Sequence, residues 1–304
     1  FALGMAITFQ PTLASQGELI PGDRGDTVHF HFLLENHWQW LSGERSSGFW
    51  DPAIGHPMKG ALAQGDVMLS FAAFYVPWRA VGADPESAYL YWILCIALMN
   101  FGAMLTLLRR VFLQGPLASA MGATLFAFSN SLWAQVGHPQ LLPQFFAVGA
   151  LAAVLTFFAA PRGLTSDDTP GEVFTRERWA IVGYSACVVA QLWGGFYNGY
   201  FIVLISAVAL GVGLVRRDSR HLLIIQLNRH RAWLIASGVT CAALLAPLAI
   251  RYIAAQGISQ RVGVGAGELR LPRLASYFYM GPDNFFYGWA AVYAPFAGLS
   301  EAHE

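Results

Sequence analysis

The stretch that decides the fold is residues 179–215, WAIVGYSACVVAQLWGGFYNGYFIVLISAVALGVGLV, a run of 37 residues without Asp, Glu, Lys or Arg. As a single helix it would extend about 55 Å, whereas a bilayer core is roughly 30 Å thick and takes about 20 apolar residues to cross. The run therefore predicts two membrane-spanning helices. The turn between them is expected at residues 194–199, GGFYNG, because glycine and asparagine favour a tight reversal.

The same criterion predicts further spans on both sides of this run. Residues 87–108 form one span, and residues 111–161 form two that divide at Gly137-His138-Pro139-Gln140. Residues 232–254 form another, in which Pro247 is tolerated if neighbouring helices satisfy the freed carbonyl. The predicted fold class is all-α, a polytopic helical bundle in a membrane.

The chain divides into one transmembrane domain with four parts. Residues 67–78 are too short to cross, and they are predicted to lie at the membrane surface. Because the chain begins inside an apolar run, we interpret it as a fragment. Its parts are a partial transmembrane helix (1–15), an outer loop with interfacial helices (16–86), six transmembrane helices (87–254) and an outer aromatic-rich segment (255–304).

Composition supports a membrane location and excludes other classes. Of the 304 residues, 56% are apolar and 12% are charged, about half the charged fraction of a soluble domain. The 18 basic residues balance 18 acidic ones, so there is no basic excess for a nucleic-acid partner. Three cysteines within apolar runs do not indicate a disulfide framework.

Arginine placement predicts the orientation. Arginines cluster at 109–110, 162–178 and 216–231, which fall on one side of the predicted bundle. That side holds ten arginines and five acidic residues, a net charge of +5, and the rest of the chain carries −5. Since arginine-rich short loops stay cytoplasmic, the acidic first loop is predicted to lie on the outer face.

The outer loop contains an amphipathic helix and most of the histidines. Residues 27–41, TVHFHFLLENHWQWL, mix apolar and polar residues and are followed by Ser42-Gly43. The spacing of His29 and His31 places their rings on different sides of a helix, and no HExxH motif or cysteine pair accompanies them. We therefore favour interfacial histidines that face lipid headgroups over a zinc site.

Two carboxylates, Asp23 and Asp26, precede this helix in the segment PGDRGD. Asp26 is interpreted either as the N-cap of the helix or as a general base or metal ligand that faces a cavity at the membrane surface. The two roles are compatible. Glycines at 22 and 25 allow close approach of the backbone to a substrate.

Polar residues elsewhere are predicted on the same face. His138 and Gln140 either belong to a simple proline turn or line a cavity opposite Asp26. Arg270 and Arg273 in the tail are suited to a lipid phosphate, although ordinary headgroup contact predicts the same arginines. The aromatic stretch 276–289 is typical either of sugar packing or of an aromatic belt.

The order of these parts resembles the C-type glycosyltransferase superfamily, which includes protein O-mannosyltransferases and the lipid A aminoarabinose transferase. The resemblance covers most of the chain in layout. It is carried by residues 22–27 (GDRGDT), 49–52 (FWDP) with 55–57 (GHP), 81–88 (VGADPESA) and 107–112 (LLRRVF).

The resemblance implies a sugar transfer from a polyprenyl-phosphate donor to a glycan, lipid or protein acceptor, with inversion, on the outer face of the bacterial inner membrane. Asp26 corresponds to the catalytic carboxylate of the first loop, and Asp23 is the alternative. In the second outer loop, His138 and Gln140 stand where the family often has an acidic residue. No cofactor is certain, and a divalent metal ion is left open. The expected substrate contacts are His138, Gln140, His56, Arg270 and Arg273.

Two other function classes compete with the enzyme. A transporter or flippase of lipid-linked sugars would show ionisable residues near the bilayer midplane or broken helices in paired halves. A non-catalytic membrane assembly subunit would fill the predicted cavity with aromatic side chains. An ordered cavity that contains Asp26 and His138 would favour the enzyme.

Overall fold

The computed structural model describes residues 1–54, 56–159, 170–255 and 289, and within them it contains helices and no strand. The described residues up to 255 belong to one compact unit, Phe1–Gln256. The α-helices in chain order are α1 (Ala2–Thr8), α2 (Gln10–Ala14), α3 (Asp26–Ser42), α4 (Leu69–Ala72), α5 (Val76–Ala80), α6 (Pro85–Thr106), α7 (Pro116–Ala127), α8 (Asn130–Trp133), α9 (Phe145–Ala159), α10 (Pro170–Gly194), α11 (Phe196–Val215), α12 (Arg217–Arg229) and α13 (Arg231–Ala255).

Four helical segments of the described residues are long and apolar enough to cross a membrane. They are Pro85–Val111, Pro139–Phe158, Phe196–Val215 and Arg231–Ala255. The first includes the π-helical turn η2 (Leu107–Val111), and the second begins with the 3₁₀ turn η3 (Pro139–Leu141). The prediction of an all-α chain with several apolar membrane-length helices is therefore confirmed in this coarser form.

The uncharged run of 37 residues breaks where the sequence predicts. Helix α10 ends at Gly194, Gly195 is extended, and α11 begins at Phe196. A Cβ on Gly194 would come within 2.5 Å of the Phe71 ring, and one on Gly195 would come within 3.0 Å of the Gln140 carbonyl oxygen. The two glycines thus permit close packing as well as the reversal.

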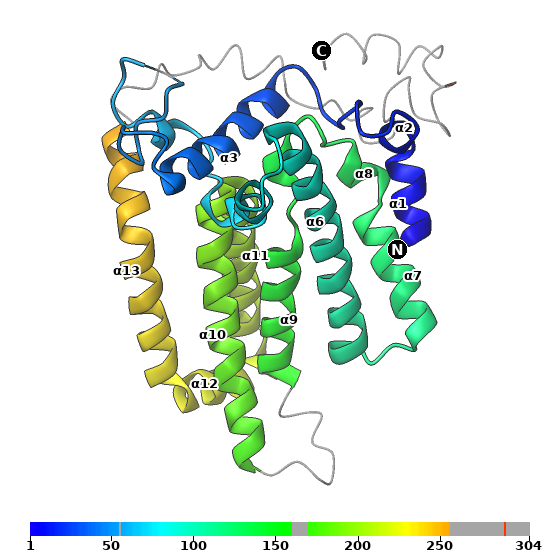
Figure 1. Ribbon diagram of the computed structural model, residues 1–304. Helices are drawn as coiled ribbons and strands as arrows, with labels where there is room; N and C mark the ends of the chain where they lie inside the picture. Colours follow the sequence, from blue (N-terminus) through cyan, green and yellow to red (C-terminus); the bar gives the residue numbers. More distant parts are fainter. Residues whose placement is uncertain (55, 160–169, 256–288, 290–304) are drawn as a thin grey trace. The chain divides into compact units, whose positions relative to one another are not determined.

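The long helices pack as neighbours, with smaller elements at both ends (Figure 1). Helix α10 contacts α9, α11 and α13, while α6 contacts α7 and α9. Helix α3 lies across one end of this bundle, and α12 lies across the opposite end (Figure 1). The arginines of 109–110 and 216–231 belong to the end with α12, as the orientation prediction requires.

The amphipathic helix is confirmed as α3, which ends at Gly43 in the left-handed conformation (φ 78°). Its buried face includes Phe30, Leu33 and Leu34, at the spacing of a helix that packs on one side. Glu35 anchors α3 to α5 because its carboxylate accepts from Arg79 Nε at 2.8 Å and Tyr75 Oη at 2.6 Å. The same carboxylate raises the pKa of Arg79.

Residues 67–78 form α4, the first part of α5 and their connection, with Val67, Met68, Phe71 and Tyr75 fully buried in the protein and Ala73 and Pro77 exposed. One sequence prediction is wrong in detail. The first half of 111–161 was predicted to form one membrane-spanning helix, but its α7 has only 12 residues, about 18 Å in length. The chain turns after α7, and a new short helix, α8, begins with Ser129 as its N-cap.

Candidate functional site

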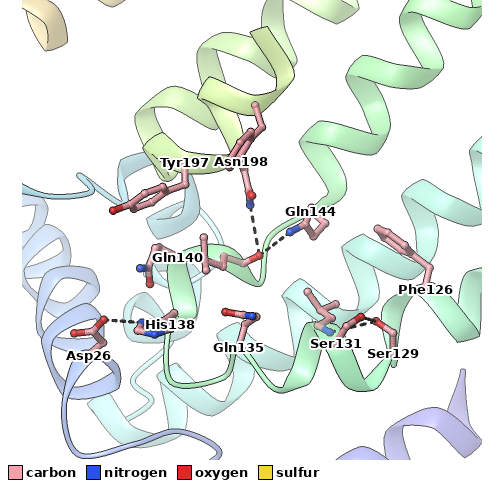
Figure 2. A pocket seen from close by; sticks show the side chains of 13 residues that line it. Asp26, Phe126, Ser129, Ser131, Gln135, His138, Gln140, Gln144, Tyr197 and Asn198 are labelled. Carbon is pink, nitrogen blue, oxygen red and sulfur yellow. Dashed lines mark hydrogen bonds and ion pairs between the residues drawn. The ribbon is translucent and has the colours of Figure 1, made fainter. Parts of the chain in front are cut away.

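A cavity of about 660 Å³ lies at the α3 end of the bundle, and we name it the Asp26 cavity. It is surrounded by the start of α3, the segment 129–141, and the beginnings of α9 and α11 (Figure 2). Its lining residues are Asp26, Phe126, Ser129, Ser131, Leu132, Gln135, His138, Gln140, Leu141, Gln144, Tyr197, Asn198 and Phe201.

Asp26 and His138 meet in this cavity, although 112 positions separate them in the sequence. His138 Nδ1 lies 2.7 Å from Asp26 Oδ2, and both side chains are about half exposed. Figure 2 shows the two side chains pointing toward one another from α3 and from the turn before η3. When Nδ1 carries the ring proton and donates it to the carboxylate, Nε2 is left as a proton acceptor.

The turn that carries His138 is held by backbone bonds and by a buried asparagine. The His138 amide donates to Gln135 O at 2.7 Å, and His138 O accepts from the Leu141 amide at 2.9 Å. Asn100, fully buried in α6, donates to Leu142 O and accepts from the Gln144 amide, both at 2.9 Å. Pro139 therefore turns the chain, and the same turn directs His138 to Asp26.

Asp23, not Asp26, holds the start of α3. Its Oδ1 accepts from the amides of Gly25 and Thr27, each at 3.0 Å, and its own amide donates to Thr27 Oγ1 at 2.9 Å. These bonds, chiefly that from Thr27, lower the pKa of Asp23. The interpretation of Asp26 as the N-cap is wrong because Gly25 occupies that position and the Asp26 carboxylate is bonded to His138.

Asp23→Ala is expected to loosen the first turn of α3, whereas Asp23→Asn, which keeps an acceptor oxygen, is expected to preserve it. Because folding lowers the pKa of Asp23, its stabilising effect is present above the ordinary pKa of 3.8 and is lost as pH falls through the folded value. Amide hydrogen exchange at Gly25 and Thr27 near neutral pH measures the difference. Equal exchange in both variants would contradict this role.

The chain matches no protein-family model, no curated protein and no solved structure. The residues of the cavity therefore carry the argument for function.

The remaining predicted site residues are placed as follows. Gln140 lines the cavity, is 7% exposed, and its Oε1 has no hydrogen-bond partner. His56 is exposed and does not line the Asp26 cavity. Arg270 and Arg273 lie outside the described residues, as does the aromatic stretch before Trp289. The structure thus brings together Asp26, His138 and Gln140 from the predicted set.

Two histidines of α3 have structural roles instead of facing lipid headgroups. His37 is fully buried, its Nε2 lies 2.6 Å from Val67 O, and burial lowers its pKa to about 4. His31 Nε2 lies 2.9 Å from Pro85 O, and burial lowers its pKa as well. The prediction that these residues lie at an interface is wrong because α3 packs this side against α4, α5 and the start of α6.

Sequence reasoning missed several polar residues of the cavity. Ser129, Ser131 and Gln135 precede His138 within an apolar run, and Tyr197 and Asn198 follow the double glycine. We expected the last two to form only a turn. The sequence did contain a signal for these residues, namely polar side chains beside a break in a long apolar run. Irregular backbone at membrane depth is tolerated where it lines a cavity, so such a break indicates a cavity.

The side chains of the cavity supply few ligands for a hard divalent cation. Such ions take six or more oxygen ligands, and Mg²⁺ commonly takes only one or two carboxylates together with substrate phosphates and water. Asp26 is the single carboxylate in the Asp26 cavity, and one of its oxygens is bonded to His138. Among the residues that the structure describes, no three His, Cys, Asp or Glu side chains are grouped as metal ligands.

Proposed function

We propose that the protein is a membrane glycosyltransferase that moves a sugar from a polyprenyl-phosphate donor to a hydroxyl acceptor, with the Asp26–His138 pair as general base. The observation that carries this proposal is the carboxylate–imidazole pair in a polar cavity at one end of an apolar bundle. A carboxylate that orients an imidazole is a recurring arrangement for deprotonating a hydroxyl group.

The cavity lining suits a sugar. Hydroxyl and carboxamide groups provide both donors and acceptors for sugar hydroxyls, and the lining has such groups at Ser129, Ser131, Gln135, Gln140, Gln144, Tyr197 and Asn198. Gln140 Oε1 lacks a hydrogen-bond partner among the residues that the structure describes, so a donor from a ligand would satisfy it. Phe126, Leu132 and Phe201 supply the apolar part of the wall, suited to sugar ring carbons and to the first prenyl units.

In the proposed reaction, His138 Nε2 accepts the proton of the acceptor hydroxyl while Asp26 keeps the Nδ1 proton on the ring. The acceptor oxygen forms a bond to the anomeric carbon from the side opposite the phosphate. The bond between that carbon and the phosphate oxygen breaks, and polyprenyl phosphate leaves with the electron pair. Inversion at the anomeric carbon follows from this geometry. This assigns the proton to His138, whereas the sequence resemblance implied Asp26.

The membrane location proposed for this reaction follows from charge. The Asp26 cavity is lined by the start of α3, and α12 carries arginines of the 216–231 cluster. Helices α3 and α12 lie at opposite ends of the bundle (Figure 1). Under the positive-inside rule the cavity opens at the outer face, in a bacterial inner membrane if the family resemblance holds. The substrates would then be a polyprenyl-phosphate sugar and an extracytoplasmic glycan, lipid or protein.

Purified protein in phospholipid vesicles, given polyprenyl phosphate that carries a radiolabelled sugar, tests the activity. We expect release of polyprenyl phosphate and transfer of the label to methyl glycosides or to water, with inverted configuration by NMR. Vesicles with the Asp26→Asn/His138→Gly double variant are the control. Movement of the intact lipid-linked sugar between leaflets without release would support the transporter instead. Absence of both reactions would contradict enzyme and transporter alike and favour the assembly subunit.

A further inference from the structure

A second, smaller cavity of about 200 Å³ lies beside α3, between this helix and the loop that follows it. We name it the Asp66 cavity. Its polar lining comes from His29, Gln64 and Asp66, and its apolar lining from Leu33, Pro52, Ile54, Met58 and Leu62. Ligand cavities for drug-sized molecules measure about 300–1,000 Å³, so this one suits a ligand the size of a single ring.

Asp66 is the unusual group in this cavity. It is 7% exposed, and its Oδ1 accepts from the Phe196 amide at 2.5 Å. Its Oδ2 makes no hydrogen bond to the described part of the chain. Burial raises the pKa of Asp66, partly offset by the Phe196 amide and by His29. A largely buried carboxylate whose second oxygen makes no hydrogen bond to the described residues can accept from a hydroxyl group of a ligand in the cavity.

The loop that forms the outer wall of the cavity is held in place by specific bonds. Arg45 donates to Asn36 Oδ1 at 2.6 Å and to Asp51 O at 3.2 Å. Asp51 Oδ1 in turn accepts from the Gly60 amide at 2.7 Å. These bonds tie the two ends of the loop to each other and to α3.

The two cavities adjoin the same two helix starts. Asp26 and His29 are three residues apart on α3, and side chains at this spacing are neighbours with Cβ atoms about 5–6 Å apart. On α11, Phe196 bonds to Asp66, while the next residues, Tyr197 and Asn198, line the Asp26 cavity. A ligand at Asp66 would thus lie about one helical turn from the Asp26–His138 pair.

We propose that the Asp66 cavity binds the acceptor as an uncharged sugar ring, whose hydroxyls donate to Asp66 Oδ2 and bond to the His29 ring, while apolar residues contact its carbon face. The donor, which carries a phosphate and prenyl units, is assigned to the larger Asp26 cavity because that cavity has the space for it and an apolar wall of Phe126, Leu132 and Phe201. This inference rests on the proposed function, because only a transfer reaction requires a separate acceptor.

Two single-cysteine variants test the assignment without measuring catalysis. Gln64→Cys places a thiol in the Asp66 cavity, and Ser131→Cys places one in the Asp26 cavity. Each is made in a background where Cys95, Cys187 and Cys241 are alanine. We expect methyl glycosides of mannose, glucose or galactose at millimolar concentration to slow maleimide labelling at position 64 several-fold and to leave position 131 unchanged. The polyprenyl-phosphate sugar is expected to do the opposite.

Adding Asp66→Asn to the Gln64→Cys variant is expected to abolish the protection by glycosides. The asparagine side-chain oxygen can still accept from the Phe196 amide, so the substitution is expected to keep the fold. The control is Glu18→Gln, a change at another acidic residue before α3. Three results would each overturn the assignment. In the first, glycosides still protect position 64 after Asp66→Asn; in the second, no glycoside slows labelling at position 64; in the third, only the donor protects that position. Failure of the proposed function is distinguishable, because the wild-type protein would then release no polyprenyl phosphate.

Discussion

Replacing His138 by glycine is expected to lower the rate of sugar transfer by about 10²–10⁴-fold, the range for loss of a general base. The reason is the 2.7 Å contact in which Asp26 Oδ2 holds His138 Nδ1 and leaves Nε2 toward the cavity. The side chain is 54% exposed, so its removal should leave the melting temperature nearly unchanged. The initial rate of label transfer in vesicles measures the effect.

Added imidazole is expected to restore part of the activity of His138→Gly, since a small base can occupy the space left by the side chain. It should not rescue Asp26→Asn, in which the ring is present but its tautomer is no longer held. The Asp26→Asn/His138→Gly double variant should be little slower than the slower of the two single variants. When two residues act as one catalytic unit, removing the second has little further effect on the rate. His56→Gly is the matched control, as this exposed histidine does not line the Asp26 cavity.

The roles of the two residues can be separated by the pattern of rates. If His138→Gly transfers sugar at the wild-type rate while Asp26→Asn does not, Asp26 alone is the base, as the sequence resemblance implied. If imidazole rescues neither variant and both are inactive, His138 orients a substrate instead of moving a proton. Wild-type rates in both variants would remove the pair from the mechanism.

Long uncharged runs made the main helices predictable. Residues 87–108 and 232–254 became α6 and α13 within a few positions, because a run of apolar residues of that length has few alternatives to a helix. The length of the run 179–215 predicted a break, and the glycines and asparagine of 194–199 indicated where it lies. The amphipathic pattern of 27–41 likewise identified α3, and a glycine marked its end.

Tertiary contacts decided what the sequence pattern could not. Residues 67–78 are apolar and short, and the same pattern suits an interfacial helix and a buried one. Only the contacts of α4 and α5 with α3 show which side chains of the segment are buried in the protein. The roles of Asp23 and Asp26 differ because their hydrogen-bond partners differ. The partner of Asp26 is His138, which lies 112 positions from it in the sequence. Proximity of that kind has no signature in a single sequence, although both residues were among the predicted candidates.

The charged start of α10 shows the same limit. Glu177 lies in the segment 162–178, whose arginines were used to predict the orientation, yet its side chain is fully buried. Its Oε2 lies 2.7 Å from His230 Nε2, and its Oε1 accepts from Gln226 Nε2 at 2.8 Å. Gln226 also donates to Phe157 O at 3.2 Å. The cluster therefore connects α9, α10 and α12 at the arginine-bearing end of the bundle.

Glu177→Ala is expected to destabilise the protein by about 3–5 kcal/mol, the cost of removing one partner from a buried pair. The change leaves His230 Nε2 and one Gln226 proton without their acceptor in a site that water does not reach. Glu177→Gln should cost less, because the amide oxygen still accepts one of the two bonds. Thermal unfolding in detergent, followed by tryptophan fluorescence, should show a melting temperature lower by roughly 10 °C for the alanine variant.

Asp218→Asn is the matched control, since this carboxylate is exposed in the first turn of α12. Glu177→Ala/His230→Ala should be little less stable than Glu177→Ala alone, because the second substitution removes a group that has already lost its partner. Additive losses would mean that the two side chains stabilise the bundle independently. A loss below 1 kcal/mol in Glu177→Ala would contradict the buried pair and indicate that water reaches Glu177. Sugar transfer by folded Glu177→Ala should stay near the wild-type rate. The cluster involves α12, and the Asp26 cavity is lined by the start of α3, and these two helices lie at opposite ends of the bundle (Figure 1).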